Sequence, residues 1–166
     1  EGMLSSYKFI QKLWALNEQI NQIIKLKNCS KNIEIDIFTN RAIFKINQAI
    51  EKFRYNVIIA TYHEIYSFFK KIIDSNKNFE NLRENFVKIL IIMSPVIPHL
   101  TSESLTNLNY SKNVKWPNVL KEYLKDEKIQ LVIQINGKKK HIIEIEKDLE
   151  ESEIKNQINK LNLLKK

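Results

Sequence analysis

The sequence has few of the residues that interrupt or cross-link a chain: two glycines, three prolines and one cysteine among 166 residues. The scarcity of glycine and proline favours long helices or strands without breaks. The single cysteine, Cys29, cannot form an internal disulfide, which fits a reducing compartment. No run of about 18 uncharged apolar residues could span a membrane, and Lys8 and Lys12 interrupt any signal-peptide pattern. We therefore expect a cytoplasmic protein without membrane contact.

Groups that carry out chemistry are also missing from the sequence. Cys29, His63, His99 and His141 are scattered singly, without the spacing of zinc ligands. The chain has no glycine-rich phosphate loop, no Cys/His nucleophile pair and no clustered pair of carboxylates. We therefore predict no catalytic residue, no cofactor-binding residue and no metal ligand in this chain.

What the chain does have is a large apolar fraction and an excess of positive charge. Hydrophobic residues make up 43% of it, enough to bury a core. The formal net charge of +8 favours an anionic partner, with nucleic acid ahead of a membrane surface. Residues 1–124 hold 17 Lys and Arg against 11 Asp and Glu, whereas residues 125–166 hold 10 against 8. The first part therefore carries most of the excess and should provide most of the attraction for phosphate.

Apolar residues in the first part recur every three or four positions, which is the spacing of amphipathic helices. Residues 86–93 are hydrophobic on nearly all sides, so this helix should lie in the middle of a bundle. Ser94-Pro95 should end it, Pro98 fits the first turn of the next helix, and Asn56 is predicted to cap an earlier one. The pattern predicts a mainly α fold, with an antiparallel bundle of about five helices near residues 4–26, 36–54, 57–74, 79–93 and 98–108.

One helix face carries a stripe of basic and polar residues. Arg41, Lys45, Gln48 and Lys52 are spaced four, three and four residues apart, which puts three cations on one face about a turn apart. Such a stripe can be a solvated surface, or it can follow the phosphates of an RNA backbone without reading bases. Both interpretations stay open, and Arg41, Lys45 and Lys52 are candidate RNA-binding residues.

Residues 125–166 follow a different pattern, typical of a small α+β domain. Apolar and polar residues alternate on both sides of Asn136-Gly137, a strong hairpin signal. Because the apolar positions on both arms are mainly odd-numbered, only an odd-length loop puts them on one face. We predict a three-residue or bulged turn around Gly137.

A helix should follow the hairpin. Asp148 and Glu151 have the spacing of a capping box, and Ile154, Ile158 and Leu161 form an apolar stripe. One hairpin and one helix make a thin core, so this domain should need docking or a further strand.

Several of these motifs resemble those of one family. One resemblance is to the end of the anticodon-binding bundle of class I aminoacyl-tRNA synthetases. It rests on the hydrophobic helix at 86–93, the Ser-Pro-x-x-Pro-His sequence that follows it, and Trp116-Pro117. Arg54-Tyr55-Asn56 is similar to the Arg-Phe-Asn junction of the leucine-type bundle. The hairpin sequence at 131–138, Leu-Val-Ile-Gln-Ile-Asn-Gly-Lys, resembles the one that opens the C-terminal domain of bacterial-type leucyl-tRNA synthetases, and it is the most specific of these motifs.

The resemblance implies a non-catalytic, C-terminal part of such an enzyme, with a bundle over 1–124 and a tRNA-binding domain over 125–166. The His-Ile-Gly-His and Lys-Met-Ser-Lys-Ser motifs of the chemistry are absent. ATP would be used by the catalytic domain of the parent enzyme, which attaches leucine to tRNA(Leu), and this part would need no cofactor. Its expected partners are tRNA(Leu) and the catalytic and editing parts of the same polypeptide, in a monomeric protein.

The resemblance also makes the basic turn Lys138, Lys139 and Lys140 the best candidate for tRNA contact. The family usually has an Arg soon after the first of these lysines, whereas here the run continues to His141. The chain stops at Lys166, before the final strands that the family's small domain normally has, so we expect that domain to be incomplete.

Two other interpretations remain. The chain could be the bundle of a valine, isoleucine or methionine enzyme, which shares the proline corner but not the hairpin. It could also be a helical protein-interaction module whose charge is incidental, which predicts no affinity for RNA even at low salt.

Overall fold

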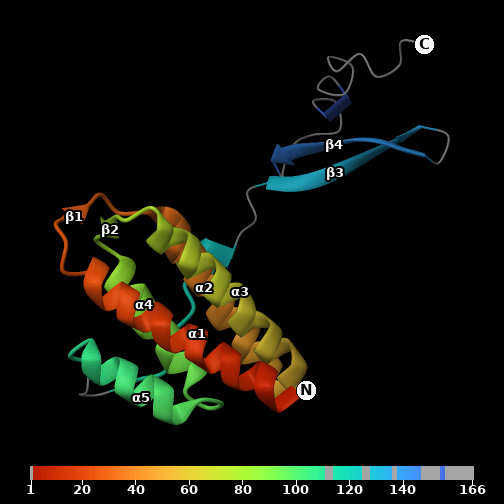
Figure 1. Cartoon of the computed structure of the whole chain (residues 1–166). Coiled ribbons are helices and arrows are strands. Elements are labelled where there is room, and N and C mark those ends of the chain that lie inside the picture. The colour runs from red at the N-terminus through yellow and green to blue at the C-terminus, as the bar shows by residue number, and fades with distance from the viewer. Residues whose placement is uncertain (1, 111–113, 125–127, 136–137, 147–153, 156–166) are drawn as a thin grey trace. The chain divides into compact units, whose positions relative to one another are not determined.

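The computed structural model describes residues 2–110, 114–124, 128–135, 138–146 and 154–155. The chain divides into two compact units, residues 1–124 and residues 125–166. The first unit is a bundle of helices and the second contains a β-hairpin (Figure 1). The predicted fold class, mainly α with a small β-containing addition, is confirmed. Among the described residues, no helix is long and apolar enough to cross a membrane.

Five α-helices and one short 3-10 helix form the described part of the first unit, as the apolar spacing predicted. Two strands of two residues each, β1 and β2, follow the first and third helices. The elements are α1 Gly2–Ile23, β1 Asn28–Cys29, α2 Ile33–Glu51, α3 Tyr55–Asp74, β2 Asn78–Phe79, α4 Leu82–Met93, α5 Pro98–Asn107 and η1 Lys121–Leu124.

Several helix starts differ from the prediction. The helix expected from near Phe79 begins only at Leu82, because Phe79 belongs to strand β2. The helix expected from about Asp36 begins at Ile33, because the Asn32 side chain caps it by accepting a hydrogen bond from the Glu34 amide at 3.0 Å. The predicted cap at Asn56 is wrong, since α3 already begins at Tyr55. Its N-cap is Arg54, whose side chain makes no capping bond. The close connection between α2 and α3 leaves no room for a separate capping residue.

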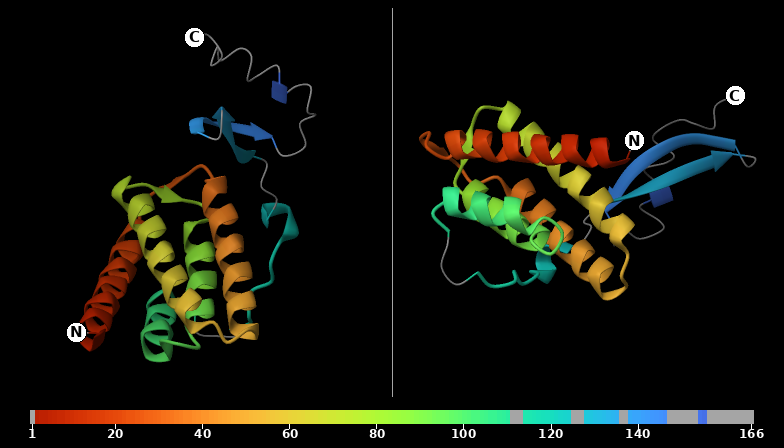
Figure 2. Two further views of the ribbon diagram at one scale, coloured as in Figure 1. Left: turned by 90° about the vertical axis from the view of Figure 1, so that its right-hand side faces the viewer. Right: turned by 60° about the horizontal axis from the view of Figure 1, so that its bottom comes forward.

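Consecutive helices of the bundle alternate in direction, so α1 and α3 run the same way. The segments that follow them therefore meet at one end, where β1 and β2 pair in parallel, with Asn28 opposite Asn78. We call this the β1–β2 end. The start of α1, the junction of α2 with α3 and the turn between α4 and α5 lie at the other end, the α2–α3 end (Figure 2).

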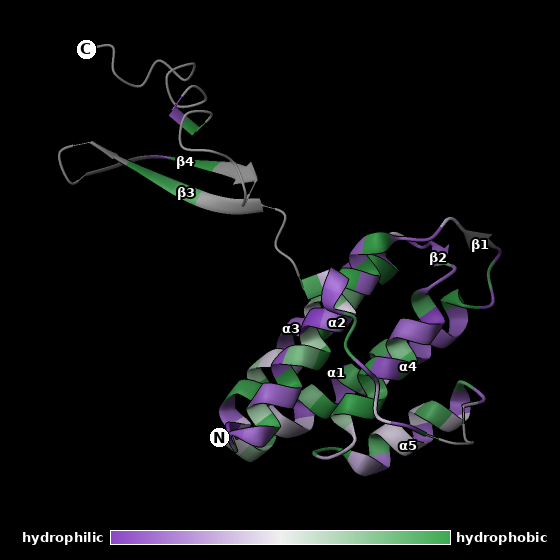
Figure 3. Ribbon diagram, turned by 180° about the vertical axis from the view of Figure 1, so that it is seen from behind, coloured by the Kyte–Doolittle hydropathy of each residue, from purple (hydrophilic) through white to green (hydrophobic). Residues whose placement is uncertain are grey.

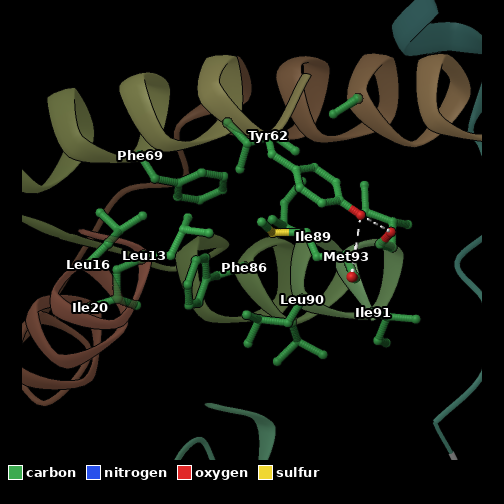
Figure 4. Close-up of a cluster of buried hydrophobic side chains, with 14 of the residues drawn as sticks. Leu13, Leu16, Ile20, Tyr62, Phe69, Phe86, Ile89, Leu90, Ile91 and Met93 are labelled. Carbon is green, nitrogen blue, oxygen red and sulfur yellow. Dashed lines mark hydrogen bonds between the residues drawn. The ribbon is translucent and has the colours of Figure 1, made fainter. Parts of the chain in front are cut away.

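Helix α4 forms the centre of the core. Nine of its twelve residues are buried, which confirms the prediction that the hydrophobic helix at 86–93 lies in the middle of the bundle. Tyr62 of α3 is also buried, and its hydroxyl donates to the carbonyls of Ile92 and Met93 at 3.3 Å each (Figure 4). Both carbonyls lie in the last turn of α4, and that of Met93 also accepts from the amides of Val96 and Ile97 at 3.2 and 3.1 Å. Burial raises the pKa of Tyr62, so the phenol stays protonated as a donor.

The outer helices show the two-sided composition that the sequence predicted. On the helices in Figure 3, hydrophobic and hydrophilic residues alternate along each helix, as a surface helix requires. The α3 residues Tyr62 and Phe69 are buried, so these aromatic side chains pack in the core and do not form an exposed stacking surface. Pro98 occupies the first turn of α5, as predicted.

Residues 114–124 run back along α2. The indole nitrogen of Trp116 donates to Asn47 Oδ1 at 2.9 Å, and the Leu120 amide donates to Asn40 Oδ1 at the same distance. Pro117 is buried. The Trp-Pro pair therefore attaches the chain that leaves the bundle to the side of α2.

In the second unit, β3 Lys128–Ile135 and β4 Lys138–Glu146 form an antiparallel hairpin. Leu131 lies opposite Ile143, and the register shifts between Ile133 and Gln134. This shift leaves Lys140 without a partner and puts the odd-numbered apolar residues of both strands opposite one another. The expected pairing of odd-numbered apolar residues is confirmed, but the predicted odd-length loop is wrong: Ile135 pairs with Lys138, and the extra residue lies at the register shift within β4.

The remaining predictions for this unit fall mostly outside the described residues. Asn136-Gly137, the capping box at Asp148 and Glu151, and the apolar positions Ile158 and Leu161 all lie there. Ile154 and Lys155 are helical.

Candidate nucleic-acid interface

The basic stripe on α2 differs from a simple row of free cations. Arg41 and Lys52 are exposed, and Lys52 is the C-cap of the helix. Lys45, between them, places its Nζ 2.7 and 2.8 Å from the two carboxylate oxygens of Glu64 on α3. An exposed ion pair of this kind contributes at most about 1 kcal/mol and can exchange for another anion. The stripe exists, but its middle charge is already neutralised.

The three lysines predicted at the hairpin are in the second unit, at the start of β4. Lys138 lies opposite Ile135, Lys139 opposite Gln134, and Lys140 at the register shift. Their side chains lie outside the described part of the chain. The backbone therefore places the three lysines of the predicted basic turn at the start of strand β4, with Lys140 at the register shift.

A further group of cations lies at the β1–β2 end, and no sequence pattern predicted it. Lys25, Lys27 and Lys77 are exposed, and Lys27 and Lys77 directly precede the paired strands β1 and β2. The parallel register therefore brings these two lysines to neighbouring positions. None of the ion pairs between described residues involves any of the three. We call Lys25, Lys27 and Lys77 the basic cluster.

The buried Asn78 holds this arrangement in place. Its Nδ2 donates to the carbonyl of Leu26 at 2.9 Å and to that of Ile24 at 3.2 Å. These are carbonyls at the C-terminal end of α1 that have no partner within the helix. One side chain therefore satisfies the end of α1 and ties the segment after α3 to it, which keeps Lys27 beside Lys77.

Hydrogen bonds around Asp36 fix the neighbouring loop. Asp36 forms an ion pair with Lys31 at 2.9 Å and accepts a hydrogen bond from Asn85 Nδ2 at 2.7 Å. Asn81 Nδ2 donates to the Asn32 carbonyl at 2.8 Å. Burial by itself favours a higher pKa for Asp36, but the interactions with Lys31 and Asn85 outweigh it and hold the pKa below its ordinary value. The loop before α2 is thus joined to the start of α4 by charged and amide groups.

A cavity of about 500 Å³ opens at the same end between α1, α4 and α5. Lys25 and Arg83 contribute positive charge to its wall, and Glu18 contributes one negative charge. Arg83 donates from Nη2 to the Leu108 carbonyl at 2.6 Å, which fixes its guanidinium at the end of α5. Arg83 therefore adds one further positive charge at the β1–β2 end, on the wall of a cavity that Lys25 of the basic cluster also lines.

The arrangement can attract phosphate but cannot perform chemistry. Neighbouring like charges repel, and an anion between them removes that repulsion, so a phosphate backbone is a suitable ligand for the basic cluster. Among the described residues, no group of three or more His, Cys, Asp and Glu side chains could hold a metal ion. Sequence periodicity could not reveal the cluster, because Lys27 and Lys77 are fifty positions apart in two polar loops.

The chain matches one family of known proteins over most of its length. The sequence pattern of the family described as the anticodon-binding domain of tRNA ligase matches residues 32–155, about three quarters of the chain. The chain belongs to this family. The family resemblance inferred from the proline corner, the Trp-Pro pair and the hairpin is therefore confirmed.

This anticodon-binding domain is similar in sequence to leucine–tRNA ligases along its whole length. That of Borrelia garinii subsp. bavariensis is 30% identical over 175 residues, which cover 100% of this chain and 20% of the relative. That of Prochlorococcus marinus subsp. pastoris is 32% identical over 161 residues, covering 90% of this chain and 18% of the relative. The chain thus spans about a fifth of the length of the relatives it matches.

A solved structure shares the fold of this anticodon-binding domain. It is the ternary complex of the Agrobacterium radiobacter K84 agnB2 LeuRS with tRNA and LeuAMS, with a TM-score of 0.65 and 18% sequence identity. The match covers 95% of this chain and 21% of that one. The likeness therefore extends through nearly all of the chain.

Proposed function

We propose that this chain is the tRNA-binding, C-terminal part of a leucine–tRNA ligase and that it positions tRNA(Leu) for a reaction carried out elsewhere. The observation that carries the proposal is the alignment with leucine–tRNA ligases over both units, including the hairpin. The hairpin also favours the leucine enzyme over a valine, isoleucine or methionine enzyme, since the latter share only the bundle features.

In this proposal the chain contributes binding and no chemistry. The parent enzyme's catalytic domain uses ATP to attach leucine, and the present part holds no cofactor. Its partners are tRNA(Leu) and the catalytic and editing parts of the same polypeptide, and the whole acts as a monomer in the cytoplasm.

The physical basis of binding is contact with phosphates. The basic cluster, the exposed Arg41 and Lys52, and the lysines of the hairpin supply point charges at several places on the two units. Lysines contact phosphates without distinguishing bases, so they position the RNA more than they select its sequence. The proposal therefore predicts strong dependence of tRNA affinity on salt.

The test is filter binding of a tRNA(Leu) transcript to the full-length parent protein over a range of salt concentrations. We expect K27Q/K77Q and K138Q/K139Q/K140Q each to weaken binding and to flatten the slope of log K against log salt by about 0.7 to 0.9 per lost phosphate contact. The matched control is K8Q/K12Q, which removes two exposed charges from α1 and should change the slope less.

Equal slopes for K27Q/K77Q and K8Q/K12Q would remove the basic cluster from the RNA interface. An unchanged slope for the triple variant would do the same for the hairpin lysines. Charging of tRNA by the parent with leucine, but not with valine, isoleucine or methionine, tests the identity of the enzyme. A parent that charges no tRNA with leucine would refute the proposed function.

A further inference from the structure

Three helices of the bundle end in a residue with left-handed backbone geometry, and one of the three residues does not suit it. Among the described residues other than glycine, Phe53, Asn76 and Asn109 have positive φ angles, of 51°, 51° and 54°. They directly follow the C-caps of α2, α3 and α5. Asparagine tolerates this conformation, whereas a bulky side chain is strained in it. The left-handed conformation of the turn therefore does not account for a phenylalanine at position 53.

Hydrogen bonds fix the turn at Phe53. The Phe53 amide donates to the Ile50 carbonyl at 3.0 Å, and the Arg54 amide donates to the Ala49 carbonyl at 2.8 Å. This is the Schellman arrangement that closes a helix, and glycine or asparagine normally provides its left-handed residue. Here the turn instead holds an aromatic side chain outward, with 76% of its surface exposed.

Phe53 is part of a larger exposed apolar surface at the α2–α3 end of the bundle. Met3 is 88% exposed, and Tyr55 is 62% exposed. Figure 2 shows that the start of α1, the junction of α2 with α3 and the turn before α5 all lie at this end. The large exposed hydrophobic residues there, which we call the apolar surface, are Met3, Leu4, Tyr7, Ile50, Phe53, Tyr55, Ile59 and Val96.

We infer that the apolar surface is where the catalytic part of the parent polypeptide packs against this chain. The inference rests on the proposed function, because it identifies the rest of a leucine–tRNA ligase as the occupant. The chain spans about a fifth of its relatives, so about four fifths of the parent lies outside it. A domain linked to the bundle through the same polypeptide is present at high effective concentration, which favours docking on this surface.

The composition of the surface favours a protein over RNA. Aliphatic side chains such as Leu4, Ile59 and Val96 cannot stack on bases or pair with phosphates. The residues of the apolar surface also outnumber the exposed cations Lys8, Lys52 and Arg54 near it. Protein interfaces are enriched in Met, Phe, Tyr and Arg, all of which occur here. Large exposed apolar side chains gathered at one end of a protein commonly mark such an interface.

The test compares the full-length parent with the isolated 166-residue chain by hydrogen exchange and thermal unfolding. Backbone amides around residues 3–7 and 53–59 should exchange at least tenfold more slowly in the parent than in the isolated chain. F53N should raise the Tm of the isolated chain by a few degrees, because asparagine suits the left-handed turn and no buried contact is lost. In the parent, F53N should instead lower the Tm and remove the protection.

L26N is the matched control, since Leu26 is a 47% exposed apolar residue at the β1–β2 end. It should change neither the protection nor the difference in Tm between parent and chain. Leu4→Ser provides an independent variant on another helix, with no change of backbone geometry, and should remove the protection as F53N does.

Three outcomes would overturn the inference. Equal exchange of these amides in the parent and in the chain means that nothing docks there. Self-association of the isolated chain that F53N and Leu4→Ser abolish assigns the surface to a second copy, and weaker tRNA binding by F53N in the isolated chain assigns it to RNA. A parent that still charges tRNA with leucine in any of these cases keeps the proposed function intact.

Discussion

The two ends of the bundle are made from the same helices but have opposite surface chemistry. At the β1–β2 end, asparagine side chains satisfy helix ends and loops: Asn32 caps α2, Asn78 binds carbonyls at the end of α1, and Asn81 binds Asn32. At the α2–α3 end, the N-caps Arg54 and Ile97 make no side-chain capping bond, and Asn81, the N-cap of α4 at the β1–β2 end, makes none either. Exposed lysines surround the first end and exposed apolar side chains the second.

The difference shows that the connections between helices give each end its binding properties. The helices contribute a common core through α4, which is shared by both ends. A polar end that satisfies its own backbone groups is stable in water and can attract an anion. An end with large exposed apolar side chains leaves hydrophobic surface to be covered by something else. Three predictions test this comparison.

The largest effect is expected from Asn78→Ala at the β1–β2 end. The variant removes the donor for the Ile24 and Leu26 carbonyls and should lower the free energy of unfolding by about 2 to 3 kcal/mol. Urea denaturation of the chain measures the change. Asn56→Ala, at an exposed position in α3, is the control and should stay within about 0.5 kcal/mol of the wild type. A similar loss for both variants would show that the asparagines do not stabilise this end specifically.

A smaller effect, dependent on pH, is expected from Asp36→Asn. Because the folded pKa of Asp36 is lower than its unfolded value, the stabilisation is present above the unfolded pKa and is lost as the pH falls through the folded pKa. The variant should lose about 1 to 2 kcal/mol near neutral pH, and its difference from the wild type should shrink below about pH 4. Unfolding curves at several pH values measure this difference. A difference that stays constant down to pH 2 would contradict the assigned charge interaction.

The smallest effect concerns the side of the bundle between the two ends. Glu64→Gln removes the carboxylate that pairs with Lys45 and should leave the Lys45 ammonium group available to another anion. If the stripe contacts phosphate, the affinity for tRNA should rise by about twofold, which matches the small free energy of an exposed ion pair. Filter binding measures it, with Glu103→Gln on α5 as a control of equal charge change. Equal affinities of the two variants would show that the stripe is only a solvated face.

Local patterns in the sequence predicted most of the fold. The three- and four-residue spacing predicted five helices, the apolar segment at 86–93 predicted the central α4, and the odd-numbered apolar positions predicted the offset of the hairpin. Each of these depends on residues close together in the chain. The start of α3 was mispredicted at Asn56, since the Schellman turn at Phe53 joins α2 to α3 without a separate cap.

The candidate site was much less predictable, and the reason is distance along the chain. The sequence by itself determined an excess of positive charge, a hydrophobic central helix and a hairpin, because composition and periodicity are local properties. Only the tertiary structure decided that Glu64 neutralises Lys45, that Lys27 lies beside Lys77, and that the start of α1, the α2–α3 junction and the turn before α5 lie at one end. These placements depend on which helix ends meet when the bundle packs, and that is set by burial of the whole core.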